Sequence, residues 1–139
     1  MTIKEKENSI KEEFELFGDD WESKYEHLIE IGKAYPQMNQ NLKTEDKLIR
    51  GCQSRVWLNS RIEGGKVFFD VDSDAAIPKG IVALVANVLS GNSPDEIANA
   101  DLLFIDEIGL KEHLSPTRAN GLLSMIKQMK LDAMVLKNK

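Results

Sequence analysis

The sequence is poor in the residues that would hold a fold together by a disulfide or a metal. It has a single cysteine, Cys52, in 139 residues, so no disulfide can form within the chain. The two histidines, His27 and His113, lack the close spacing that zinc sites use. The importance of Cys52 must therefore lie in its chemistry or its packing, and no metal site is expected.

Long apolar segments and basic clusters are also missing. The longest apolar run, residues 81–89, is broken by Asn87 and is far shorter than the ~20 residues that cross a bilayer. The formal net charge is -5 and the basic residues are scattered, which disfavours nucleic-acid binding. Residues 1–17 are charged and amphipathic, unlike a signal or transit peptide. We therefore expect a cytoplasmic protein with neither membrane nor nucleic acid as partner.

The composition is that of one globular domain. Hydrophobic residues make up 42% of the chain and charged residues 29%, which is ordinary for a soluble protein. A chain of about 150 residues buries roughly 68–70% of its unfolded surface, enough for one core. Residues 1–139 are therefore predicted to form a single domain.

Apolar spacing and capping residues predict helices toward both ends of the chain. Gly18 should end the first helix, and Asp19 with Glu22 resembles a capping box for the second. Residues 72–74 offer acceptors that could cap an almost wholly apolar third helix. The helices are predicted over residues 3–17, 21–32, 77–89 and 102–108, with a short one near Pro94 and a long one from Ser115-Pro116.

The middle of the chain predicts a small sheet. Residues 56–62 and 67–71 alternate apolar and polar side chains on either side of Gly64-Gly65, which is typical of a β-hairpin. Residues 35–51 show no sustained period and are interpreted as a surface loop, with a third strand possible near residues 48–50. The predicted class is α+β: a small antiparallel sheet of two or three strands covered by helices.

Cys52 stands in an unusual local sequence. A lone cysteine most often packs as a small hydrophobic residue, but this one lies between a polar loop and a strand. Gly51 can turn the chain sharply and present the next side chain at a loop tip. Gln53 and Ser54 can hydrogen-bond a thiolate or a persulfide, and capping a turn explains them equally well. The setting favours a reactive thiol.

A reactive thiol needs its thiolate form, and an ordinary thiol is only about 3% ionised at neutral pH, so a cationic neighbour matters. Arg55 is near in sequence but can face the other side of its strand. Arg118 stands in the first turn of a helix, which is unfavourable for a cation and indicates a specific partner. A surface salt bridge or a helix-capping contact is the alternative for Arg118.

Three blocks of the sequence together resemble the SufE family of sulfur acceptors for cysteine desulfurases. They are residues 51–57 (GCQSRVW), residues 72–80 (DSDAAIPKG) and residues 113–122 (HLSPTRANGL). Trp21-Glu22 and Lys24-Tyr25 also look like the opening of that family. The resemblance covers nearly the whole chain.

The resemblance implies an α+β fold of the SufE/IscU-like type in which Cys52 accepts sulfur from the persulfide of a SufS-type desulfurase. The pyridoxal phosphate would belong to that partner, so no cofactor is expected here, and the sulfur would pass to an iron–sulfur scaffold complex. CsdE-type proteins share these blocks, which leaves the donor open. The implied catalytic residues are Cys52, Arg118 and Asp74, with Gly51, Gln53 and Ser54 shaping the cysteine loop.

Such a protein would be a sulfur-transfer partner rather than a stand-alone enzyme. We expect Cys52 to shelter against apolar residues in the free protein and to swing out on Gly51. A non-catalytic interaction module is one alternative. A thiol redox sensor would need an intermolecular disulfide. A hydrolase using Ser115 or Ser54 with His113 lacks a nucleophile-elbow pattern.

Overall fold

The alternating segment at the centre of the chain forms a β-hairpin, as predicted. In a computed structural model that describes residues 1–138, β1 (Val56–Glu63) pairs antiparallel with β2 (Lys66–Ser73). Gly64 and Gly65 have φ values of 58° and 78°, the left-handed conformation that a two-residue hairpin turn requires. Every second side chain of β2 is buried, so one face of the hairpin covers the core.

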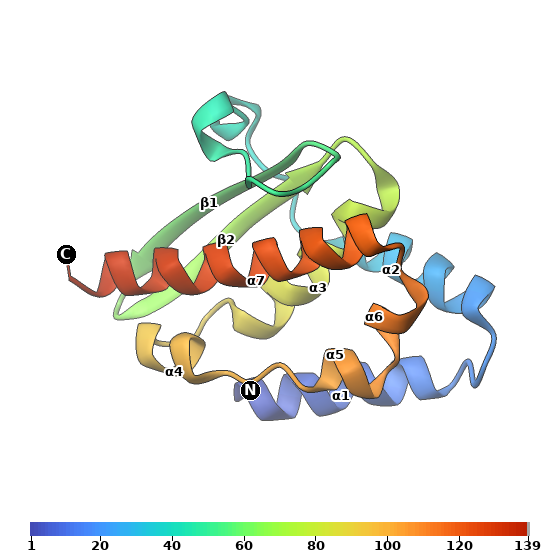
Figure 1. Ribbon diagram of the computed structural model, residues 1–139. Helices are drawn as coiled ribbons and strands as arrows, with labels where there is room; N and C mark the ends of the chain where they lie inside the picture. The colour runs from blue at the N-terminus through green and yellow to red at the C-terminus, as the bar shows by residue number, and fades with distance from the viewer. Residues whose placement is uncertain (139) are drawn as a thin grey trace.

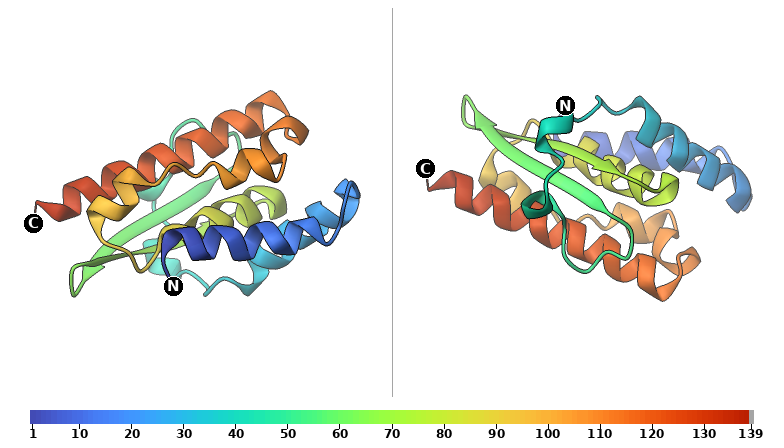
Figure 2. Two further views of the ribbon diagram at one scale, coloured as in Figure 1. Left: turned by 90° about the horizontal axis from the view of Figure 1, so that it is seen from below. Right: turned by 90° about the horizontal axis from the view of Figure 1, so that it is seen from above.

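Helices pack around this hairpin in the predicted α+β class (Figure 1). The central helix α3 lies between β2 and α1, while α7 runs beside β1 (Figure 2). Within residues 1–138 no helix has both the length and the apolar character needed to cross a membrane. The helices are α1 (Ile3–Glu15), α2 (Trp21–Ala34), α3 (Ala76–Leu89), α4 (Pro94–Asn99), α5 (Phe104–Glu107), α6 (Leu110–His113) and α7 (Pro116–Lys137).

Two helix starts differ from the prediction. The N-cap of α2 is Asp20, whose side chain accepts from the Ser23 backbone N–H at 3.2 Å, so the Asp19 capping box was wrong by one residue. The N-cap of α3 is Ala75, without a side-chain cap. The acceptors predicted to cap α3 instead bind the chain ahead of β1, as described below. The predicted starts of α4 and α7 are confirmed: Ser93 caps α4 in a capping box with Glu96, and Ser115 caps α7.

Two segments are more structured than predicted. The single helix expected over residues 102–108 is shorter at its start, where Leu102 takes a φ of 55°. Gly109, with a φ of 77°, separates it from the unpredicted α6. Residues 35–51 contain two short 3₁₀ helices, η1 (Gln40–Leu42) and η2 (Glu45–Lys47). The third strand is reduced to one bridge between Leu48 and Trp57, so the sheet has two strands.

Helices α2 and α3 cross at two glycines. A Cβ on Gly80 would lie 2.2 Å from the Leu28 carbonyl oxygen, and a Cβ on Gly32 would lie 3.0 Å from the Gly80 nitrogen. Real Cβ atoms do not approach backbone this closely, so the crossing depends on the missing side chains. The contact fixes the N-terminal half of α3, which supports the cysteine site.

We expect Gly80→Ala to lower the free energy of unfolding by about 2 kcal/mol or more, because the clash is with backbone. Urea unfolding followed by circular dichroism measures the change. Gly121→Ala in α7 is the control, since its Cβ would make ordinary contact at 3.5 Å from the Cys52 sulfur. It should gain up to about 1 kcal/mol of helix propensity. Equal stability of the two variants would contradict the tight crossing.

One buried carboxylate works against stability at neutral pH. Glu7 on α1 is only 3% exposed, and within residues 1–138 its Oε2 has no hydrogen-bond partner. Burial raises the pKa of Glu7; Asp101 and Glu107 also raise it, while Lys4 opposes them. A carboxyl group with a raised folded-state pKa favours folding when protonated. That contribution is lost as pH rises from the unfolded pKa through the folded one.

Glu7→Gln should therefore raise the free energy of unfolding by about 1 kcal/mol at neutral pH, because the neutral amide escapes the cost of a buried charge. The gain should shrink as the pH falls toward about 4, where the glutamic acid is itself neutral. Thermal melts of both proteins across this pH range measure the difference. Glu12→Gln, at an exposed position of α1, is the control. A gain that does not change with pH would contradict the assignment.

Candidate functional site

The cysteine loop lies against the N-terminal half of α7. It joins the Leu48–Trp57 bridge to the start of β1 and passes close to α7 (Figure 2). Gly51 has a φ of 92°, in the left-handed region that favours glycine. A Cβ there would lie 2.4 Å from the Ser124 hydroxyl oxygen. The positive φ therefore favours glycine at this position, in agreement with the sharp turn predicted for it, while the Ser124 hydroxyl could rotate away from a Cβ.

The Cys52 thiol is half-buried above a helical position that has no side chain. Its Sγ lies 3.7 Å from the Gly121 carbonyl oxygen, which accepts a weak hydrogen bond from the thiol. A Cβ on Gly121 would come within 3.5 Å of the sulfur. The sulfur thus occupies the space that a side chain on α7 would otherwise fill.

A small cavity of about 70 Å³ adjoins the thiol. It brings together four of the six residues predicted for the site, with apolar side chains from β1, α3 and α7. The cavity is lined by Cys52, Gln53, Ser54, Val56, Pro78, Ile81, Thr117, Arg118, Gly121 and Met125.

The Cys52 thiol has the electrostatics of a sheltered group rather than an activated one. Burial raises the pKa of the Cys52 thiol, so the free protein holds it protonated at neutral pH. Arg55 is turned away and pairs with Glu45 at 3.2 Å. Arg118 lines the cavity, yet the shift is upward. In the free protein, burial therefore keeps the Cys52 thiol in its protonated, less reactive form.

Asp74 closes the downstream end of the cysteine loop. Its Oδ1 accepts from the Arg55 backbone N–H at 3.1 Å, and its own N–H donates to the Arg55 carbonyl at 3.2 Å. The Ser73 hydroxyl donates to that same carbonyl at 2.6 Å. Asp74 is therefore near the cysteine loop, as the resemblance implied. It holds the backbone three residues after Cys52 and does not line the cavity.

A buried ion cluster anchors the upstream side. Asp72 at the end of β2 pairs with Lys43, and with Lys79 of α3 at 3.5 Å. Burial alone would raise the pKa of Asp72, but the hydrogen bond from Lys43 leads the interactions that hold it below its usual range. Lys43 also lies 5.7 Å from the Trp57 ring centroid. The cluster ties the segment before the loop to the hairpin and to α3.

An aromatic stack positions the start of α7. The His113 ring lies parallel to Trp21, with centroids 3.7 Å apart, and the Tyr25 hydroxyl donates to the His113 carbonyl. The Ser115 hydroxyl accepts from the Arg118 N–H at 3.3 Å as the helix cap. These contacts give His113 and Ser115 structural roles at the entrance to the helix that carries Arg118.

Besides Arg118, α7 contributes residues to the site that were not predicted from the sequence. Gly121, Thr117 and Met125 line the cavity, and Gly121 makes room for the sulfur. A glycine inside a predicted long helix was the available signal, because glycine costs helix stability unless packing requires it. Within residues 1–138 no three His, Cys, Asp or Glu side chains are placed to hold a metal ion.

A family model described as SufE, an Fe-S metabolism associated domain, matches residues 8–133. The chain belongs to the SufE family. The family assignment ties it to iron–sulfur metabolism and confirms the resemblance of the three sequence blocks.

Relatives of known sequence support the assignment. An uncharacterized SufE-like protein of Rhizobium meliloti (strain 1021) is 43% identical over 122 residues, covering 84% of this chain and 87% of its own. One of Rhizobium etli is 42% identical over 125 residues, covering 86% of this chain and 84% of its own.

A solved structure shares the fold. The solution structure of a hypothetical protein from Thermus thermophilus superposes with a TM-score of 0.78 at 22% identity, covering 96% of this chain and 97% of that one. At that identity the likeness concerns the fold alone, and it supports the α+β architecture predicted for a SufE-family chain.

The raised thiol pKa predicts slow alkylation of the native protein. Iodoacetamide reacts with the thiolate, so its rate should rise with pH along a curve whose midpoint lies above that of the urea-unfolded chain. Cys52 is the only cysteine, and the assay reports on it alone. A native midpoint at or below the unfolded one would show that Arg118 or another group already activates the thiol.

Proposed function

We propose that this SufE-family protein accepts sulfur from a cysteine desulfurase as a persulfide on Cys52, and so activates the desulfurase. The observation that supports this most directly is the placement of the one thiol of the chain on a loop, beside a small cavity and Arg118. A structural cysteine would be expected in the fully buried core. Cys52 is instead half-buried at its edge.

The transfer step is a thiol exchange. The Cys52 thiolate attacks the terminal sulfur of the donor's cysteine persulfide, and a new bond forms between that sulfur and Cys52 Sγ. The donor's S–S bond breaks, and its electron pair leaves with the donor cysteine as a thiolate. The proton lost by Cys52 balances the one taken up by the donor, and no outside oxidant or reductant is needed.

The cavity suits a stored persulfide. A water molecule needs roughly 10–15 Å³ of such space, so the cavity of about 70 Å³ leaves room for one added sulfur atom. Val56, Ile81 and Met125 provide apolar walls that keep water and solutes from the sulfur. The Arg118 guanidinium in the same lining would attract the negative charge of a persulfide.

Partners follow from this role. The donor is a SufS-type desulfurase, which carries the pyridoxal phosphate, and the loaded sulfur passes to an iron–sulfur scaffold complex in the cytoplasm. A CsdE-type role with another desulfurase uses the same chemistry. In either case the sheltered thiol must leave the Gly121 contact and turn outward, with Gly51 as the hinge.

The test is mass spectrometry of the intact protein after incubation with each cysteine desulfurase of the same organism and free cysteine. We expect the mass of one added sulfur on the wild type, removed by a reducing agent, and no gain on Cys52→Ser. A wild type that stays unmodified with every desulfurase would refute the proposal.

A desulfurase activity assay separates acceptor from non-catalytic module. If Cys52 carries the sulfur, Cys52→Ala loses the activation while still binding the desulfurase. Full activation by Cys52→Ala would instead assign the chain a docking role in which the thiol is packing.

A further inference from the structure

The outer face of α7 carries an exposed apolar stripe. Four of the seven large hydrophobic residues that are exposed within residues 1–138 lie on this one helix. They are Leu123, Leu131, Met134 and Val135, with exposures of 49%, 50%, 38% and 56%. A helical turn of 3.6 residues places these four, together with Lys127, within about one third of the helix circumference. They form one continuous surface, about 18 Å long.

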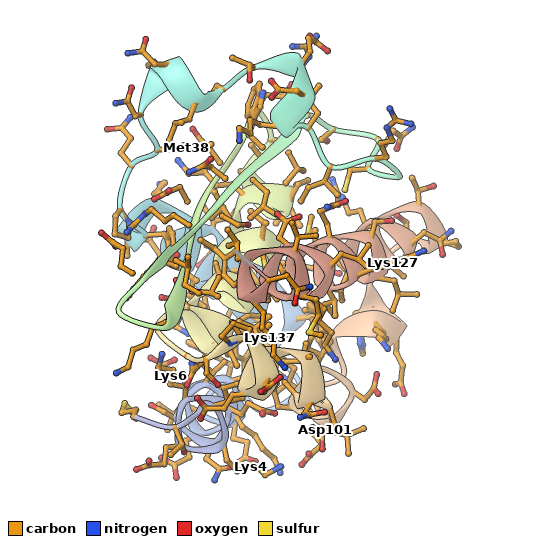
Figure 3. The ribbon with its side chains drawn as sticks, turned by 90° about the vertical axis from the view of Figure 1, so that its left-hand side faces the viewer. Lys4, Lys6, Met38, Asp101, Lys127 and Lys137 are labelled. Carbon is orange, nitrogen blue, oxygen red and sulfur yellow. The ribbon has the colours of Figure 1, made fainter. Side chains whose placement is uncertain are left out.

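The stripe contains no acidic residue. Its one charge is Lys127, which is labelled in Figure 3. Among residues 1–138, Lys127 has no ion pair. The whole helix has four basic residues and one acidic residue, in a protein whose net charge is -5. The acidic residue, Asp132, accepts hydrogen bonds from Ser60 at 2.7 Å and from Gln128 at 2.8 Å. The other three basic residues of α7 lie off the stripe, so this face presents apolar side chains and one cation.

The stripe adjoins the cysteine loop. Leu123 precedes Ser124, the residue on which Gly51 rests, and follows Gly121 and Leu122 in the segment beneath the thiol. Arg118, one turn earlier, lines the Cys52 cavity. A partner segment lying along the stripe would therefore reach the edge of the cysteine site.

We propose that this face of α7 docks an acidic, amphipathic helix of the sulfur donor; this rests on the proposed function. Lys127 would pair with a carboxylate, and Leu123, Leu131 and Val135 would meet apolar side chains spaced by helical turns. The donor is proposed as the occupant because the stripe begins beside Gly121 and Ser124, next to the thiol that the donor's persulfide must reach. A symmetric second copy of this chain would bring two Lys127 ammonium groups together.

The experiment measures binding of the pyridoxal-phosphate desulfurase that loads Cys52 to Lys127→Glu and Leu131→Gln, at low and high salt. Lys127→Glu should weaken binding about tenfold at low salt and less at high salt. Leu131→Gln should weaken it several-fold at both. Lys127→Arg should bind like the wild type. Lys4→Glu and Leu16→Gln, at exposed positions of or beside α1, are controls with the same changes and should also bind normally.

Sulfur loading gives a second readout. At saturating concentration both α7 variants should gain the persulfide on Cys52 at the wild-type rate, because they lose affinity and not chemistry. Binding equal to that of the controls would overturn the proposal while leaving the sulfur-acceptor function intact.

Three further results would also overturn it. Normal loading at all concentrations with failed delivery would assign the face to the acceptor. A wild-type dimer that Lys127→Glu dissolves would assign it to a second copy. A wild type that neither binds nor gains sulfur from any desulfurase would remove the proposed function and this inference together.

Discussion

The contact between the Cys52 sulfur and the backbone of α7 is the interaction on which the site depends. The sulfur lies over the Gly121 backbone, and Gly51, with a φ of 92°, turns the chain beside Ser124. Gly51 lies on the loop and Gly121 on the helix, and the half-buried thiol lies where these two elements meet. A side chain at Gly51 would strain the turn, because the φ of 92° favours glycine, whereas an alanine Cβ at Gly121 would make ordinary contact with the sulfur. The crossing of α2 and α3 at Gly80 supports the site indirectly. It fixes the part of α3 that provides Pro78 and Ile81 to the cavity beside Cys52.

Enclosure creates a conflict that the chemistry must resolve. A partly sheltered thiol is less open to oxidation, but burial raises its pKa and lowers the fraction of thiolate that the proposed sulfur transfer needs. The loop is held at both ends, by Asp74 on the Arg55 backbone and by the Asp72 cluster with Lys43 and Lys79. Between these anchors the thiol itself makes only a weak hydrogen bond at 3.7 Å. The segment can therefore give way locally around Cys52 while the hairpin and α3 stay fixed.

The sequence predicted features governed by local periodicity and missed those governed by packing. The hairpin, α7 and the α4 cap follow from alternation, apolar spacing and capping residues that lie close together in the chain. The predicted cap of α3 was wrong because Ser73 and Asp74 bind the backbone ahead of β1, a partner 18 or more residues away. Residues 35–51 looked irregular because their order comes from Lys43 meeting Asp72 and Trp57. At the site, Cys52 and Arg118 could be predicted from the sequence. The position of Gly121 beneath the sulfur could not, because it depends on how the cysteine loop packs against α7.

The charge of α7 differs from that of the rest of the chain. Acidic residues outnumber basic ones by 23 to 18 over the chain, yet α7 is basic, and its single carboxylate hydrogen-bonds to β1 and to its own helix. Helix α1 carries several acidic residues on its exposed side, whereas the exposed side of the 22-residue α7 carries none. The helix that shelters the thiol also presents an apolar stripe with one cation to solvent, and this stripe begins next to Ser124 and Gly121, on which the cysteine loop rests. In the proposed function, docking of the donor and release of the thiol would therefore involve the same helix.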